Sequence, residues 1–229
     1  MQEPHFRYFG YGSLVNRRTL PDGVPVVAGR LVGYRRAWRA ASHWHGRGVC
    51  ALSIEPAAGA EIDGVMVAEP VSRLAALDAR EQRYNRHLMP GHLFVPAAGT
   101  ASGAAGSGAA GEGAPDAGDF FVYRAGAAAN RFGDAARPIW LSYVDVVLQG
   151  FLDLFGEEGV RRFVATTDGW HVPIVDDRSA PAYPPAQRLS PAETAVVDAA
   201  LAAVGARPAH LSEIAGAQET SASTPAPMA

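Results

Sequence analysis

Short strand-like runs, each bounded by glycine, proline or polar residues, predict β-strands between residues 5 and 124. The first stretch, residues 5–11, is rich in aromatic side chains and ends in glycines, as a strand entering a turn does. Further strands are expected at residues 24–34, 48–54, 62–69, 92–96 and 120–124. This succession of strands favours a barrel or a curled sheet.

Apolar residues spaced three and four apart predict two helices. The first covers residues 71–85 and places Glu81 on the same face as Leu77 and Tyr84. The second covers residues 142–155, with Tyr143 pointing inward, and continues after a glycine break into residues 160–164.

A third helix has a clear start signal. Ser190 is followed by Pro191 and Glu193, which is a capping box with proline at the first helical position, and the helix is expected to end before Gly205.

Two segments lack side chains large enough to offset the entropy of ordering them. Residues 97–118 are almost entirely Ala, Gly, Ser and Thr and are expected to form a flexible loop inserted into a hairpin. Residues 215–229 are expected to be a disordered tail. We therefore expect one domain over residues 1–214, in which residues 152–214 form a helical C-terminal extension.

The charge and cysteine content narrow the partners and the compartment. A net charge of -3 gives no reason to expect nucleic acid or a membrane surface as a partner. No apolar run reaches the ~18 residues of a membrane span, and no leader sequence is visible. With Cys50 as the single cysteine, a reducing compartment fits, and we expect a cytoplasmic protein. All 20 basic residues are arginine, which excludes mechanisms that need a lysine.

The turn Gly10-Tyr11-Gly12-Ser13-Leu14 follows the first expected strand. Consecutive backbone N–H groups with little side-chain bulk can converge on an anion or a polarised carbonyl. Val15 stands where a dinucleotide fingerprint needs a third glycine, and the residues after Ser13 do not match a serine-hydrolase elbow. A structural turn and a binding loop both remain open.

Glu81 also has two interpretations. It can belong to a solvated helix end and pair with Arg80, Arg83 or Asn85. Alternatively, on the inward face beside Leu77, it is partly desolvated, which raises its pKa toward the range useful for carrying a proton. The burial of its side chain decides between the two.

A pair of histidines and a group of arginines each allow a ligand-binding interpretation and a purely structural one. His43 and His45 would share one face of a strand and could bind a metal with help from His87 or His92, but an exposed strand edge is favoured and no metal is expected.

A locally basic stretch could attract an anionic peptide, but we favour a solvated sheet face. It contains Arg30, Arg35, Arg36, Arg39 and Arg47.

Several motifs taken together resemble the γ-glutamylcyclotransferase-like superfamily, which includes the AIG2-like and ChaC-like proteins. They are Tyr8-Phe9-Gly10-Tyr11-Gly12-Ser13-Leu14, Gly64-Val65-Met66 on a later strand, Leu77-Asp78-x-x-Glu81-x-x-Tyr84-x-Arg86, and Tyr143 ahead of Gly150. The resemblance covers residues 5–152. It implies an α+β fold, a compact mixed β-barrel with packed helices.

The resemblance also implies roles for particular residues. In that superfamily a turn holds the γ-glutamyl group through backbone groups, which correspond here to Gly12, Ser13 and Leu14. Tyr11 would stand at the rim, Glu81 would be the acid/base residue, and Tyr143 would help line the same pocket. Gln82 departs from the glycine that often follows the glutamate, which leaves open the shape of the pocket beside the carboxylate.

The implied activity is the cyclisation of a γ-glutamyl group to 5-oxoproline, with release of an amine or amino acid and without a cofactor. Glutathione, γ-glutamyl amino acids and γ-glutamyl amines share the recognised part, so the substrate stays open, as does the oligomeric state. A non-catalytic module that binds γ-glutamyl ligands is the alternative, and a metal-dependent hydrolase using His43 and His45 is a third reading. The segment 168–183 either covers the mouth of the barrel or packs against it, and packing is favoured.

Overall fold

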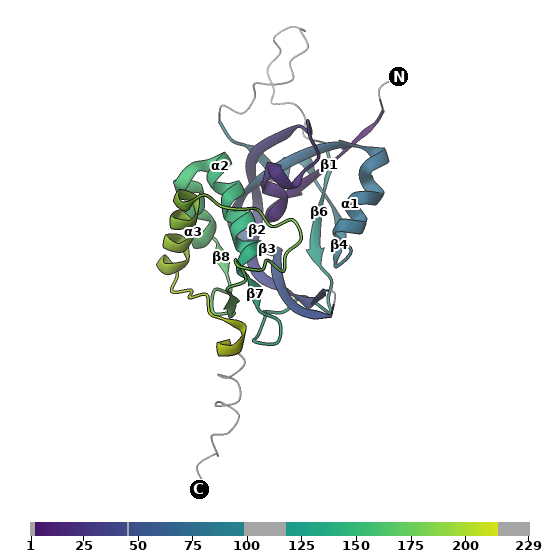
Figure 1. The fold of residues 1–229 in the computed structure, drawn as a ribbon. Coiled ribbons are helices and arrows are strands. Elements are labelled where there is room, and N and C mark those ends of the chain that lie inside the picture. Colours follow the sequence, from purple (N-terminus) through teal and green to yellow (C-terminus); the bar gives the residue numbers. More distant parts are fainter. Residues whose placement is uncertain (1–2, 45, 99–117, 215–229) are drawn as a thin grey trace.

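A strongly curled mixed sheet forms the centre of the structure, a computed structural model that describes residues 3–44, 46–98 and 118–214 (Figure 1). The strand order is β4-β6-β1-β3-β2-β5, with β8 beside β2. The strands are β1 (His5–Gly10), β2 (Val26–Trp44), β3 (Arg47–Pro70), β4 (Tyr84–Met89), β5 (Phe94–Pro96), β6 (Phe120–Ala125) and β8 (Thr167–Asp168). The β1/β6 and β2/β8 pairs are parallel and the other pairs are antiparallel.

The expected division into separate strands at 48–54 and 62–69 is wrong, because β3 runs unbroken from Arg47 to Pro70. Its partner β2 is also longer than expected. Between the two expected strands the pairing register shifts, from Val32 opposite Glu61 to Tyr34 opposite Pro56. Gly33 lies at this irregularity with a φ of 81°, which favours glycine. An irregularity of this kind bends the paired strands locally.

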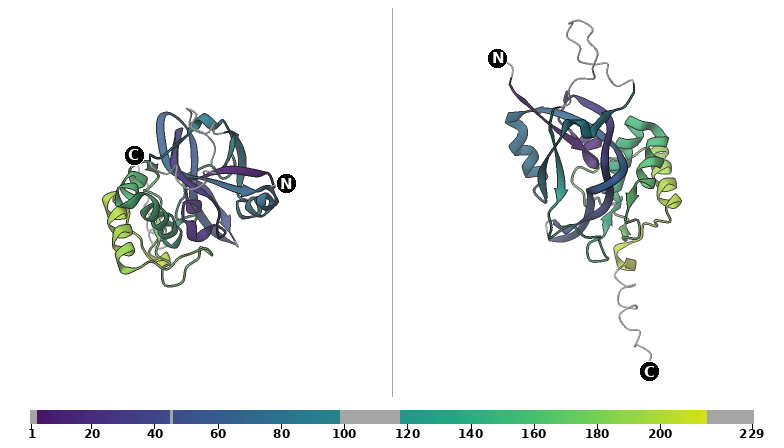
Figure 2. Two further views of the ribbon diagram at one scale, coloured as in Figure 1. Left: turned by 90° about the horizontal axis from the view of Figure 1, so that it is seen from above. Right: turned by 180° about the vertical axis from the view of Figure 1, so that it is seen from behind.

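Helices cover the sheet on two sides (Figures 1 and 2). The remaining elements are α1 (Leu74–Arg80), α2 (Leu141–Ala165), α3 (Pro191–Ala203), the small parallel sheet of β7 (Ile139–Trp140) and β9 (Ile174–Val175), and the 3-10 turns η1 (Ser13–Val15), η2 (Arg17–Thr19), η3 (Val71–Arg73) and η4 (Gly91–Leu93). The helices α2 and α3 pack together on one side, and α1 lies on the opposite side. The α+β class with packed helices is confirmed.

Two helix predictions are confirmed. In α2, Gly156 is non-helical with a φ of 64°, so the expected break is present. At the start of α3, the Ser190 hydroxyl accepts a hydrogen bond from the Glu193 amide (3.2 Å), and the Glu193 carboxylate accepts one from the Ser190 amide (2.6 Å). Residues 152–214 are not helical throughout, because β8 and β9 lie between the two helices.

The helix expected over residues 71–85 is wrong beyond Arg80. Glu81 leaves the helical conformation (φ −94°, ψ 21°), and the Tyr84 amide donates to the Glu81 carbonyl oxygen (2.8 Å) to close a turn. Tyr84 then begins β4, opposite Ala125 of β6. The spacing of three between Glu81 and Tyr84 fits a helix, but pairing with a strand distant in sequence overrides this local preference. The strand expected at 92–96 is likewise shorter, because η4 precedes it.

Arg36 contradicts the prediction of a solvated basic face, because it is fully buried. Its guanidinium carbon lies 5.0 Å from the ring centroid of Phe151 and 4.3 Å from that of Phe163, both on α2. Burial lowers the pKa of Arg36 to about 9, so the side chain stays charged at neutral pH. The prediction holds for Arg30 and Arg35, whose side chains are about half exposed.

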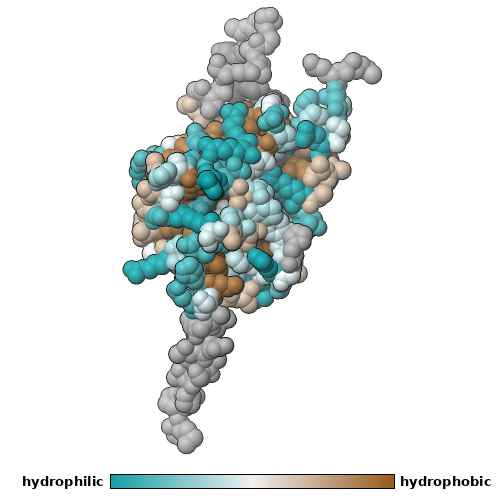
Figure 3. Space-filling model, in the orientation of Figure 1, coloured by the Kyte–Doolittle hydropathy of each residue, from teal (hydrophilic) through white to brown (hydrophobic). Residues whose placement is uncertain are grey.

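Hydrophilic residues predominate on the visible surface, with hydrophobic residues in separate spots (Figure 3). Within the described ranges, no helix combines the length and apolar character that crossing a membrane requires. Most of the loop expected at 97–118 and all of the tail expected at 215–229 lie outside the described residues.

Candidate functional site

The glycine turn connects β1 to η1 and is tightly closed. A Cβ on Gly10 would lie 2.8 Å from the Leu14 Cβ. The Val15 amide donates to the Gly12 carbonyl oxygen at 2.9 Å. Because a helical turn leaves its first amides without partners inside the turn, the N–H groups of Ser13 and Leu14 are the natural donors for a ligand.

Tyr143 of α2 lies directly over this turn. A Cβ added at Gly12 would be only 2.9 Å from the Tyr143 hydroxyl oxygen, so this position accommodates glycine and little else. The Tyr143 ring contacts Trp38 and Tyr183 edge to face, with centroids 5.9 Å and 5.0 Å away. These contacts fix the ring and therefore the position of the hydroxyl.

Gly150 explains why α2 approaches the turn so closely. A Cβ there would lie 2.6 Å from both the backbone nitrogen and the Cα of Asn16. The Asn16 side-chain amide donates to the carbonyl oxygen of Val146 (2.9 Å) and to the side chain of Gln149 (3.0 Å). Gly150 thus allows the short distance between α2 and the turn.

Glu81 lies at the C-terminal end of α1, and its side chain is only 14% exposed. Burial raises the pKa of its carboxyl above the usual 4.5, while the positive charges of Arg80 and Arg83 oppose that shift. One carboxylate oxygen lies 3.4 Å from the Arg80 Nε. The fully solvated helix end is therefore excluded, although the pairing with Arg80 is present.

The turn, the acid and the tyrosine converge on one pocket of about 30 Å³, which we call the Glu81 pocket. Its walls are Phe9, Tyr11, Gly12, Ser13, Leu14, Leu52, Glu81, Tyr84, Tyr123 and Tyr143. All six residues singled out in the sequence are among them. The structure thus brings together groups that lie far apart in the chain.

Tyr11 does not stand at the rim, in contrast to the prediction. It is 7% exposed, and its hydroxyl donates to the Tyr123 carbonyl oxygen at 2.5 Å. In the same way, the Tyr84 hydroxyl donates a hydrogen bond to the Leu52 carbonyl oxygen at 2.9 Å. Burial raises the pKa of both Tyr11 and Tyr84, so their hydroxyls remain protonated at neutral pH.

Sequence reasoning missed several walls of the pocket: Phe9, Leu52, Tyr84 and Tyr123 were assigned no role. Tyr183, which contacts Tyr143 from outside this pocket, was also assigned no role, because packing against the barrel was favoured over covering its mouth for the segment 168–183. Asp177 anchors that segment on α2: it accepts hydrogen bonds from the Ser142 hydroxyl (2.5 Å) and the Ala182 amide (2.7 Å). Tyr183 is thereby placed against Tyr143. No signal near Tyr183 in the sequence indicates this placement, because it depends on the contact of Asp177 with the start of α2.

The rest of the Leu77–Arg86 motif has a structural function. The Asp78 carboxylate accepts hydrogen bonds from the Tyr123 hydroxyl (2.6 Å) and from Arg86 (2.9 Å), which ties α1 to β6 and β4. Gln82 is exposed and does not line the pocket. The position at which the motif departs from the resemblance is therefore not part of the pocket walls.

In the described part of the chain, the histidines are not part of a metal-ligand cluster. Among residues 3–44, 46–98 and 118–214, no three His, Cys, Asp or Glu side chains are grouped as metal ligands. His45, one of the two candidates from the sequence, lies outside these ranges.

Comparison with known proteins supports the fold. No protein-family model and no curated protein matches the sequence. Among solved structures, one named gamma-glutamyl cyclotransferase matches with a TM-score of 0.51 and 15% identity, over 86% of this chain and 99% of that chain. An uncharacterised human protein matches with the same values. The chain therefore has the γ-glutamylcyclotransferase-like fold that its motifs predict.

Proposed function

We propose that this chain is a γ-glutamylcyclotransferase-type enzyme, which converts a γ-glutamyl group to 5-oxoproline and releases an amine or amino acid. The observation that carries the proposal is the Glu81 pocket, where a largely buried carboxyl and the residues of a glycine turn line one small space. The fold shared with a protein named gamma-glutamyl cyclotransferase agrees with it.

The turn would hold the substrate in the reactive conformation. The amide N–H groups of Ser13 and Leu14, which begin the 3-10 turn, would bind the substrate carboxylate or the oxygen that becomes negative in the transition state. Tyr143, fixed over Gly12, would close the other side. Since the nucleophile and the electrophile belong to one molecule, selecting the folded-back conformer can remove about 7 kcal/mol or more of the barrier.

Glu81 would carry the protons. The α-amine nitrogen attacks the γ-carbonyl carbon, a C–N bond closes the five-membered ring, and the original amide C–N bond breaks. During this exchange the attacking ammonium loses two of its three protons, and the leaving nitrogen gains two. A carboxyl whose pKa is raised by burial is a better acceptor for an ammonium proton than a solvated one. Proton transfer of this kind contributes about 10²- to 10⁴-fold in rate.

The test is a panel of glutathione, γ-glutamyl amino acids and γ-glutamyl amines, with 5-oxoproline measured by mass spectrometry. Wild type should form 5-oxoproline from at least one compound, and Glu81→Gln should lose turnover while remaining folded. Glu157→Gln is the matched control, because the Glu157 side chain is 66% exposed on α2. Normal turnover by Glu81→Gln would show that the role of Glu81 is misassigned. Binding of a γ-glutamyl compound without product would identify the non-catalytic alternative.

A further inference from the structure

A second cavity of about 300 Å³ lies beside the Glu81 pocket and shares Tyr143 with it. We call it the aromatic cavity. Its large side chains belong to Trp44, Arg47, Arg83, Trp140, Tyr143 and Tyr183. Because the Glu81 pocket measures only about 30 Å³, the aromatic cavity is the adjoining space in which the rest of a substrate can lie.

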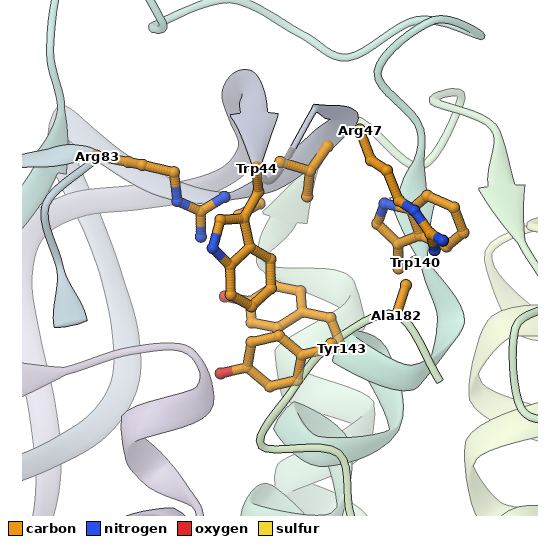
Figure 4. A pocket seen from close by; sticks show the side chains of 9 residues that line it. Trp44, Arg47, Arg83, Trp140, Tyr143 and Ala182 are labelled. Carbon is orange, nitrogen blue, oxygen red and sulfur yellow. The ribbon is translucent and has the colours of Figure 1, made fainter. Parts of the chain in front are cut away.

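Aromatic rings from separate elements form the walls of this cavity (Figure 4). Trp44 ends β2, and its ring centroid lies 6.0 Å from that of Tyr183. Trp140 is held in place because its indole N–H donates to the Gly48 carbonyl oxygen at 3.1 Å. Flat, fixed aromatic walls favour a flat apolar guest, which can stack on them or meet their edges.

The cavity is also positively charged. Among the described residues that line it there are two arginines and no carboxylate. The guanidinium carbon of Arg83 lies 5.1 Å from the ring centroid of Trp44. Its Nη1 is buried and has no hydrogen-bond partner in the described part of the chain. A buried donor without a partner is costly, and a carboxylate would satisfy it with a strong charge-assisted bond.

The two pockets share a wall at Tyr143, and Arg83 is close enough to Glu81 for its charge to act on that carboxyl. Arg83 follows Glu81 by two residues within one turn. In such a substrate, the nitrogen that Glu81 would protonate is bonded to a Cα that carries both a carboxylate and a side chain. With that nitrogen at Glu81, the carboxylate can reach Arg83 while the side chain enters the aromatic cavity.

We propose that the leaving group is an aromatic α-amino acid, whose carboxylate binds Arg83 and whose ring occupies the aromatic cavity. The proposal rests on the proposed cyclotransferase function and adds its substrate class. Glutathione would be a poor substrate, because its leaving dipeptide begins with a small thiol side chain that leaves the aromatic walls uncovered.

Three compounds separate the ring from the carboxylate: γ-glutamyl-phenylalanine, γ-glutamyl-alanine and γ-glutamyl-phenethylamine. Wild type should convert the first with a kcat/KM about 10-fold or more above each of the others. Arg83→Gln should lose the preference for the carboxylate and keep the preference for the ring, while Trp44→Ala should lose the preference for the ring. Arg161→Gln, at a side chain 63% exposed on α2, is the control and should keep both preferences.

The outcomes distinguish the two proposals. Similar kcat/KM values for all three compounds, or an unchanged carboxylate preference in Arg83→Gln, would overturn the aromatic leaving group and leave the enzyme function intact. No 5-oxoproline from any γ-glutamyl compound would instead overturn the enzyme function. A separate binding measurement uses L-phenylalanine alone, which should quench the tryptophan fluorescence of wild type and bind about 10-fold more weakly to Arg83→Gln. Failure of L-phenylalanine to bind would overturn the assignment of the cavity.

Discussion

Replacing Gly12 by alanine tests the closest contact in the site. The added Cβ would lie 2.9 Å from the Tyr143 hydroxyl oxygen and 3.4 Å from Leu52 Cδ1. The second distance is an ordinary contact, but the first is shorter than van der Waals contact allows. Tyr143 cannot easily move away, because its ring is packed between Trp38 and Tyr183.

The expected cost follows from this geometry. Forcing extra volume into a packed site costs about 1–3 kcal/mol, and we expect Gly12→Ala to lower the free energy of unfolding by that amount. Tyr143→Phe removes the hydroxyl oxygen that the new Cβ would meet. The double variant should therefore lose less stability than the sum of the two single variants, by about 0.5 kcal/mol or more.

Urea denaturation of the four proteins gives this coupling energy, provided that the slope of each transition is unchanged. Gly126→Ala is the control, since the atoms nearest to its Cβ would belong to the exposed Asn85 side chain, at 3.2 Å or more. That variant should change stability by less than about 0.5 kcal/mol. If the effects of Gly12→Ala and Tyr143→Phe add, or if Gly12→Ala is as stable as wild type, Tyr143 does not lie over the turn as described.

Two more predictions follow from the helix contact and from the charges around the acid. Gly150→Ala would bring a Cβ within 2.6 Å of the Asn16 backbone. The variant should therefore have a free energy of unfolding about 1–3 kcal/mol lower than wild type, and a lower turnover. A variant with the thermal stability of wild type would contradict the close packing of α2 on the turn. Arg80→Gln removes a positive charge that lowers the pKa of Glu81, so this pKa should rise further. The acid limb of the pH profile of kcat/KM should then move to higher pH. An acid limb that does not move would contradict its assignment to Glu81.

Features determined by neighbouring residues could be predicted from the sequence. The capping box at Ser190 is a local hydrogen-bond exchange, and it is present as expected. The turn after the first strand is marked by Gly10 and Gly12, which the sequence shows directly. The inward position of Glu81 was also predicted, but from a helix that in fact ends at Arg80.

Features determined by distant pairing could not be predicted in the same way. The start of β4 at Tyr84 depends on its partner β6, which follows much later in the chain. Arg36 is buried because Phe151 and Phe163 of α2 cover it, and nothing near Arg36 in the sequence indicates this. Tyr183 likewise reaches the site only because Asp177 binds the start of α2.

The most direct test of the account is the rate of 5-oxoproline formation by Glu81→Gln under saturating conditions, with the best substrate of the panel. We predict a kcat about 10²- to 10⁴-fold below wild type, with binding of the γ-glutamyl compound retained. A Glu81→Gln protein that forms 5-oxoproline at the wild-type rate would contradict the claim that this buried carboxyl carries the proton.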